Sequence, residues 1–147
     1  MGAWYWIGVS AGLGAALGLV VSGLSGFFHP FRGHFAVRAI VILWLGVLVG
    51  IGIRAWESGG WLDAVAGGIA AFLVFLGGAQ IVAGTLRRGG TRGGTATLFA
   101  GAALVAAGLA FIPVVGYLET ILLPALALRL RRTQPERYAG LRTLAKD

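Results

Sequence analysis

The chain has 147 residues, of which 58% are apolar and only 12% are charged, and its mean hydropathy is +0.87. A soluble domain carries roughly 25% charged residues because its surface must be solvated, so this composition excludes a disordered chain and disfavours a soluble fold. The formal net charge of +7 comes from arginines that flank apolar runs, a pattern typical of membrane orientation signals rather than of nucleic-acid binding.

Four long stretches of the chain contain no charged residue: 1–31, 39–53, 64–86 and 93–118. A hydrocarbon core about 30 Å thick needs roughly 20 helical residues, and each stretch can supply most or all of such a helix. The alternation of apolar and polar residues that a membrane barrel requires is absent. The sequence therefore predicts an all-α, polytopic helical membrane protein.

The first three predicted spans cover residues 4–26, 36–55 and 62–86. We expect the first span to be retained, because the N-terminus lacks the basic residues of a signal peptide. Arg38 and Arg54 lie near the ends of the second span, where long side chains reach the headgroups. Asp63 begins the third span, where a carboxylate meets the positive pole of the helix dipole.

The fourth apolar stretch, residues 95–128, is too long for one span. Its 34 residues would form a helix about 51 Å long, so we expect a break near Pro113 and Gly116. One interpretation is four spans followed by an interfacial helix. The other is a span over 95–112 and then a short fifth or re-entrant element over 117–130, which completes a transmembrane bundle of residues 1–130.

The distribution of basic residues favours the interpretation with five elements. Four spans would divide them 7 against 5 across the membrane, whereas five would divide them 11 against 1. The positive-inside rule then predicts an external N-terminus and a cytoplasmic C-terminus at the plasma (inner) membrane. The arginines expected at the inner leaflet are Arg87, Arg88, Arg92, Arg131, Arg132, Arg137 and Arg142.

The last segment, residues 131–147, resembles a basic tail with its own helix. Thr133 and Glu136 have capping-box spacing around Pro135, which predicts a helix start near Pro135. Its apolar residues gather on one side, as in a C-terminal amphipathic helix that lies on anionic lipid.

Small residues recur at four-residue spacing on the predicted spans, and such spacing favours close helix packing in lipid. The pairs lie in the first and second spans: Gly8, Gly12, Gly14, Gly18, Gly46 and Gly50. They are consistent either with packing inside one chain or with a homo-oligomer or larger membrane complex.

Few residues suggest chemistry. Glu119 is the one carboxylate inside an apolar stretch, and Gln80 lies within the third span, so both are candidates for a polar path, although Glu119 also fits an interfacial position. His29 and His34 lack nearby carboxylate partners, and the chain has no cysteine. We therefore predict no metal, no cofactor and no enzymatic activity.

These observations leave three functions open. The first is a membrane-embedded accessory or assembly protein that packs through its small-residue faces. The second is a small homo-oligomeric channel or transporter that uses Glu119 and Gln80. The third is a lipid-active membrane enzyme that uses His29 and His34.

Overall fold

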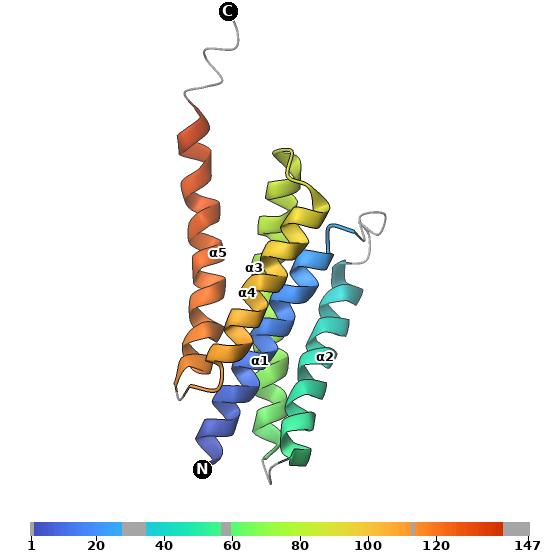
Figure 1. Cartoon of the computed structure of the whole chain (residues 1–147), viewed down its shortest axis with the longest axis vertical. Helices are drawn as coiled ribbons and strands as arrows, with labels where there is room; N and C mark the ends of the chain where they lie inside the picture. Colours follow the sequence, from blue (N-terminus) through green and yellow to red (C-terminus); the bar gives the residue numbers. More distant parts are fainter. Residues whose placement is uncertain (1, 28–34, 57–59, 113, 140–147) are drawn as a thin grey trace, which may run out of the picture.

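A computed structural model of the chain describes residues 2–27, 35–56, 60–112 and 114–139. Every regular element in these ranges is an α-helix: α1 (Ala3–Leu24), α2 (Phe35–Trp56), α3 (Trp61–Arg87), α4 (Arg92–Leu109) and α5 (Val115–Ala139). The helices run alternately up and down, so the N-terminus and the C-terminal end of α5 lie at opposite ends of the molecule (Figure 1). The predicted all-α class is confirmed.

Three of the helices, α1, α3 and α4, are long and apolar enough to cross a membrane. Helix α2 adds a shorter apolar segment, Val37–Ile53. Within the described residues α5 does not meet the same criterion, since basic residues from Arg129 onward interrupt its apolar run. Length and composition thus support a helical membrane protein.

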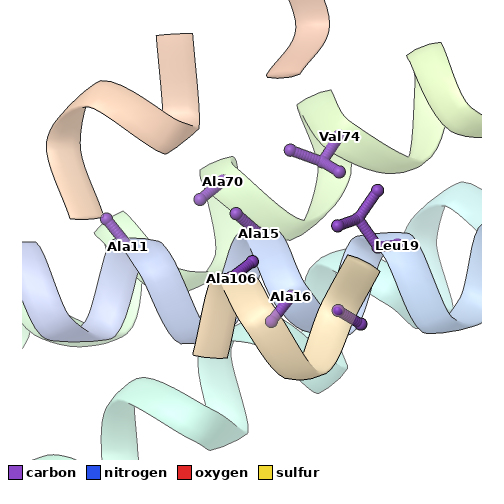
Figure 2. Packing of buried hydrophobic residues seen from close by; sticks show 8 residues of the cluster. Ala11, Ala15, Ala16, Leu19, Ala70, Val74 and Ala106 are labelled. Carbon is purple, nitrogen blue, oxygen red and sulfur yellow. The ribbon is translucent and has the colours of Figure 1, made fainter. Parts of the chain in front are cut away.

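Helix α1 is the centre of the bundle, because all four other helices pack against it. In its most apolar stretch 67% of the residues are buried, against 17% in α4. The core around it is built from small side chains, which let the helices approach closely. Figure 2 shows this core, whose buried members are Ala11, Ala15, Ala16, Leu19, Ala70, Val74, Ala103 and Ala106.

The two helices α1 and α3 lie side by side and run in the same direction. Three contacts define their register: Ser10 with Asp63, Gly14 with Gly67, and Gly18 with Ala71. Each pair is 53 residues apart, and a constant separation of this kind means parallel helices. Helix α2 packs antiparallel against α3 and also contacts α1; its Gly46 lies against Gly67, which α1 also touches, and its Gly50 lies against Ala64.

The predicted break after the fourth apolar helix is confirmed. Helix α4 ends at Leu109 and α5 begins at Val115, with Pro113 in the interval outside the described residues. The start of α4 lies earlier than expected because Thr91 caps it: the Thr91 side chain accepts a hydrogen bond of 3.2 Å from the Gly94 amide.

Helix α5 differs from both predictions made for its region. It is neither a short element over 117–130 nor followed by a separate helix near Pro135, because one helix continues through Thr133 and Glu136 to Ala139. Proline removes one backbone hydrogen bond, but the Leu, Arg, Gln and Glu residues around it are good helix formers. Residues 140–147, including Arg142, lie outside the described part.

Candidate functional site

Two acidic side chains are buried in the described part of the chain, and both lie at the end that holds the N-terminus (Figure 1). Asp63, the third residue of α3, is 1% exposed, and Glu119, the fifth residue of α5, is 9% exposed. Buried carboxyl groups in an apolar bundle are unusual and mark candidate functional sites. These two residues therefore define the candidate site.

A close crossing of α1 and α5 positions Glu119. A Cβ atom on Gly116 would overlap the Gly8 carbonyl, so the two backbones touch there. One turn later, a Cβ on Gly12 would lie 3.0 Å from Oε2 of Glu119 and 2.5 Å from Cβ of Ala110. Because Gly12 has no side chain, the carboxyl group of Glu119 can lie directly beside the backbone of α1.

The surroundings of Glu119 are poor in polar groups. Its Oε2 atom is buried and has no hydrogen-bond partner in the described structure, and it lies beside Gly12, where an added Cβ would also meet Ala110 and Gly116. An ionised carboxylate in such a place loses its hydration without gaining a counter-charge. The site therefore favours a carboxyl group that exchanges a proton.

Asp63 joins α3 to this region. The Ser10 hydroxyl of α1 donates a hydrogen bond to the main-chain carbonyl of Asp63, and the Asp63 amide donates to the Gly60 carbonyl at 3.3 Å. Tyr117, the third residue of α5, lies at the same end of the bundle as Asp63, the third residue of α3. Residues from α1, α3 and α5 thus form one polar group near the N-terminal end.

Two tyrosines tie α1 to the turn that precedes Glu119. The Tyr117 hydroxyl donates to the carbonyl of Trp4, and its ring covers Gly8, where a Cβ would lie 2.7 Å from the ring. In the opposite sense, the Tyr5 hydroxyl of α1 donates to the carbonyl of Phe111 at 3.0 Å. These reciprocal hydrogen bonds fix the start of α5 on α1.

The turn itself holds one residue in a strained conformation. Val114 has a φ of 73°, in the left-handed region that β-branched residues rarely adopt. Such a conformation costs on the order of 1–3 kcal/mol and persists only where the surroundings enforce it. The contacts of Tyr117 and Tyr5 on either side supply that enforcement.

Gln80, the second predicted member of the polar path, is not near Glu119. It lies 17 residues after Asp63 on α3, a separation of about 25 Å along the helix. It is also exposed on the outer face of the bundle, whereas Glu119 is buried. One copy of the chain therefore does not bring the two residues together.

The six predicted packing glycines all make contacts within the chain. Gly8 and Gly12 receive α5, Gly14 and Gly18 face α3, and Gly46 and Gly50 face α3 from α2. Their partners include backbone atoms of α3, for example the Ala71 carbonyl, which would lie 2.6 Å from a Cβ on Gly18. These six positions are therefore occupied by intramolecular packing.

Three of the predicted basic residues lie at the end opposite the acids. Arg87, Arg88 and Arg92 are exposed around the turn between α3 and α4. The backbone of α5 includes positions 131, 132 and 137, but these side chains, like His29, His34 and Arg142, lie outside the described set. No group of three or more metal-binding side chains occurs in the described residues.

The sequence reasoning missed Asp63 and Tyr117 as members of this site. The sequence pattern predicts only that Asp63 meets the positive pole of the helix dipole. A signal for Asp63 was present, because it shares the helical face of Gly67, Ala71 and Val74, which are small or apolar residues that belong inside a bundle. No family model, curated protein or solved structure matches the chain.

Proposed function

We propose that the chain is a small helical membrane protein that binds protons at Glu119 and conducts them across the membrane. The observation that carries the proposal is the buried Oε2 atom without a hydrogen-bond partner among glycine and alanine. Intramembrane carboxyl groups commonly belong to proton relays. Uptake and release of a proton removes and restores the charge that such a pocket tolerates poorly.

The rest of the relay runs toward the N-terminal end through Asp63 and Tyr117. Asp63 supplies a second buried acid on a different helix, at the end of the bundle where Tyr117 also lies. A carboxyl group and a hydroxyl group are both able to donate and accept protons. Two helices, α3 and α5, thus contribute to one proton path, with Glu119 as its innermost residue.

A proton suits this site better than a metal cation. Calcium takes six to eight oxygen ligands and magnesium about six, and the described residues hold no group of three or more acidic or histidine side chains. A proton needs only one oxygen atom. The single Oε2 of Glu119 meets that requirement.

For the membrane arrangement we propose five embedded helices, with the N-terminus outside and the basic C-terminus in the cytoplasm at the plasma (inner) membrane. The alternating helix directions and the exposed arginines at one end support this orientation (Figure 1). A tag on the C-terminus should be accessible only after the cells are permeabilised. A tag that antibodies reach in intact cells would overturn the orientation.

Proton flux into liposomes that contain the purified protein tests the function. With a potassium diffusion potential and a trapped pH dye, the native chain should acidify the lumen, whereas Glu119→Gln should fall to the rate of empty liposomes. Thr120→Val is the matched control, because the Thr120 hydroxyl only bonds the Gly116 carbonyl of its own helix at 3.0 Å. Equal flux in the native chain and Glu119→Gln would reject the proposal.

Proton binding has its own readout. Infrared difference spectra of the native protein should contain the carbonyl-stretch band of a protonated carboxyl group that Glu119→Gln removes and Glu119→Asp shifts. Circular dichroism and gel filtration of each variant confirm that it is folded. A spectrum unchanged by Glu119→Gln would show that this carboxyl group holds no proton.

A second candidate is the membrane-embedded accessory or assembly protein. The observation in its favour is the outer face of α4, where a Cβ on Gly101 or Gly108 would meet nothing within 4 Å. Small residues on an open face leave room for a helix of another subunit. A partner that co-purifies in fixed stoichiometry and is lost in Gly101→Leu would favour this function.

A further inference from the structure

One face of α3 is not covered by any other helix of the bundle. Its residues follow each other at spacings of three and four, as expected for one side of a helix, and those with large exposed side chains are Leu62, Val65, Ile69 and Leu73. Ile69 is 50% exposed and Leu73 is 37% exposed. Gln80 continues the same line two turns further on, and we call this surface the α3 outer face.

Gln80 is the polar side chain on this face. It precedes Arg87 by seven residues, which places it about 10 Å from the basic end of α3 and within the hydrocarbon depth of a helix that spans about 30 Å. The side chain is exposed, and no hydrogen bond joins its amide to the described residues. An amide facing lipid tails without a partner is unfavourable.

The residues after Gln80 allow another helix to come close. Ala83 is small and exposed, and a Cβ on Gly84 would have only the Arg88 guanidinium nearby, at 3.6 Å. Gly77, by contrast, is already covered by Ala127 of α5. A second helix can therefore come close to α3 over the turn that holds Ala83 and Gly84, beside the Gln80 side-chain amide.

We propose that two copies of the chain pair along the α3 outer face, with the two Gln80 amides hydrogen-bonded to each other. A glutamine amide carries both a donor and an acceptor, so it is complementary to a second copy of itself. A two-fold axis along the membrane normal places identical residues opposite each other at the same depth. This pairing does not depend on Glu119, which lies inside the bundle.

The absence of native cysteine makes a cross-linking test clean. In liposomes under mild oxidation, Ala83→Cys should form disulfide-linked dimers, because it lies one turn from Gln80 on the same face. Leu104→Cys is the control on the outer face of α4, where this side chain is 76% exposed, and it should remain monomeric. Equal cross-linking at both positions would indicate random collisions and reject the pairing.

The role of the amide is tested by energy transfer between labelled copies in liposomes at increasing dilution in lipid. Gln80→Leu should raise the dimer dissociation constant about 3- to 20-fold, the range typical of hydrogen bonds between membrane helices, and should reduce Ala83→Cys cross-linking. Gln80→Asn should keep part of the affinity. A monomeric native chain, or one bound to a different protein instead of itself, would overturn the proposal.

Proton flux separates this inference from the proposed function. Gln80→Leu should weaken the dimer while the infrared band of Glu119 persists, and Glu119→Gln should abolish flux while cross-linking at position 83 persists. Loss of both properties in Gln80→Leu would mean that the amide supports the fold rather than the dimer contact.

Discussion

The two ends of the bundle differ in whether their charged side chains are buried or exposed. At the end that holds the N-terminus, Asp63 and Glu119 are buried between helices, and the hydroxyl groups of Tyr5 and Tyr117 bond to backbone carbonyls of other elements. At the other end, Arg87, Arg88 and Arg92 are exposed around a turn. Among the described residues, the chain thus buries acidic side chains in its helix contacts at one end only, whereas uncharged Ser22 and Thr95 are buried near the other end.

This difference separates two roles of charge in one small protein. A charge that is exposed near a membrane surface orients the helices and contacts headgroups, and its removal leaves packing intact. A buried carboxyl group must be accommodated by neighbouring backbones, here through glycines at positions 12 and 116. Substitutions at the acidic end should therefore alter stability and function. Substitutions at the basic end should alter only the orientation of the chain in the membrane.

The largest contrast should come from one methyl group added at either end. Gly116→Ala places a Cβ against the Gly8 carbonyl and should lower the free energy of unfolding by about 3 kcal/mol or more. Gly93→Ala at the start of α4 meets nothing within 4 Å and should raise it by up to about 1 kcal/mol. Titration with a denaturing detergent, followed by circular dichroism, measures both values. An equal loss of free energy of unfolding in Gly116→Ala and Gly93→Ala would show that the two ends do not differ in how tightly they are packed.

A smaller effect of opposite sign is expected when the buried acid becomes apolar. Glu119→Met removes a polar atom without a hydrogen-bond partner and should raise the free energy of unfolding by about 1–3 kcal/mol, while proton flux disappears. The same detergent titration applies, with Thr120→Val as the control. A destabilised Glu119→Met protein would mean that the carboxyl group makes stabilising contacts.

The smallest effect on stability should come from the exposed arginines. Replacing Arg88 and Arg92 together by Gln should change the free energy of unfolding by no more than about 0.5 kcal/mol. In the orientation proposed above, the fraction of molecules with a cytoplasmic C-terminus should nevertheless fall, because the turn between α3 and α4 loses two positive charges. Protease protection of a C-terminal tag in membrane vesicles measures that fraction. A large loss of stability would show that these side chains hold the turn together.

Much of the fold was predictable because composition and charge act locally along the chain. The gaps between charged residues located α1 to α4 to within a few residues, and Pro113 with Gly116 located the turn before α5. The length of α5 was not predictable from hydropathy. A backbone helix does not end where its side chains become basic, since Arg, Gln and Glu form helices as readily as Leu does.

The candidate site was predictable only in part. Glu119 stood out because it interrupts an apolar stretch, but its burial depends on the crossing at Gly8, Gly12 and Gly116, which involves residues about 110 positions apart. Asp63 looked like an ordinary first-turn acid because the sequence does not reveal which face of α3 meets α1. The pairing of helices, rather than any local pattern, joined these residues.

The parallel pairing of α1 and α3 has a consequence for the order in which the protein is made. Helix α1 leaves the ribosome first, yet its glycines at positions 14 and 18 meet their partners on α3. Helix α3 cannot lie parallel to α1 until the antiparallel α2 between them in the sequence has been made. Until α3 has been made, Ser10 and Ser22 of α1 therefore lack the main-chain carbonyls of α3 to which their hydroxyl groups bond. A nascent chain that is halted before α3 should therefore need, more than the full chain does, a membrane chaperone that covers the serine-containing face of α1.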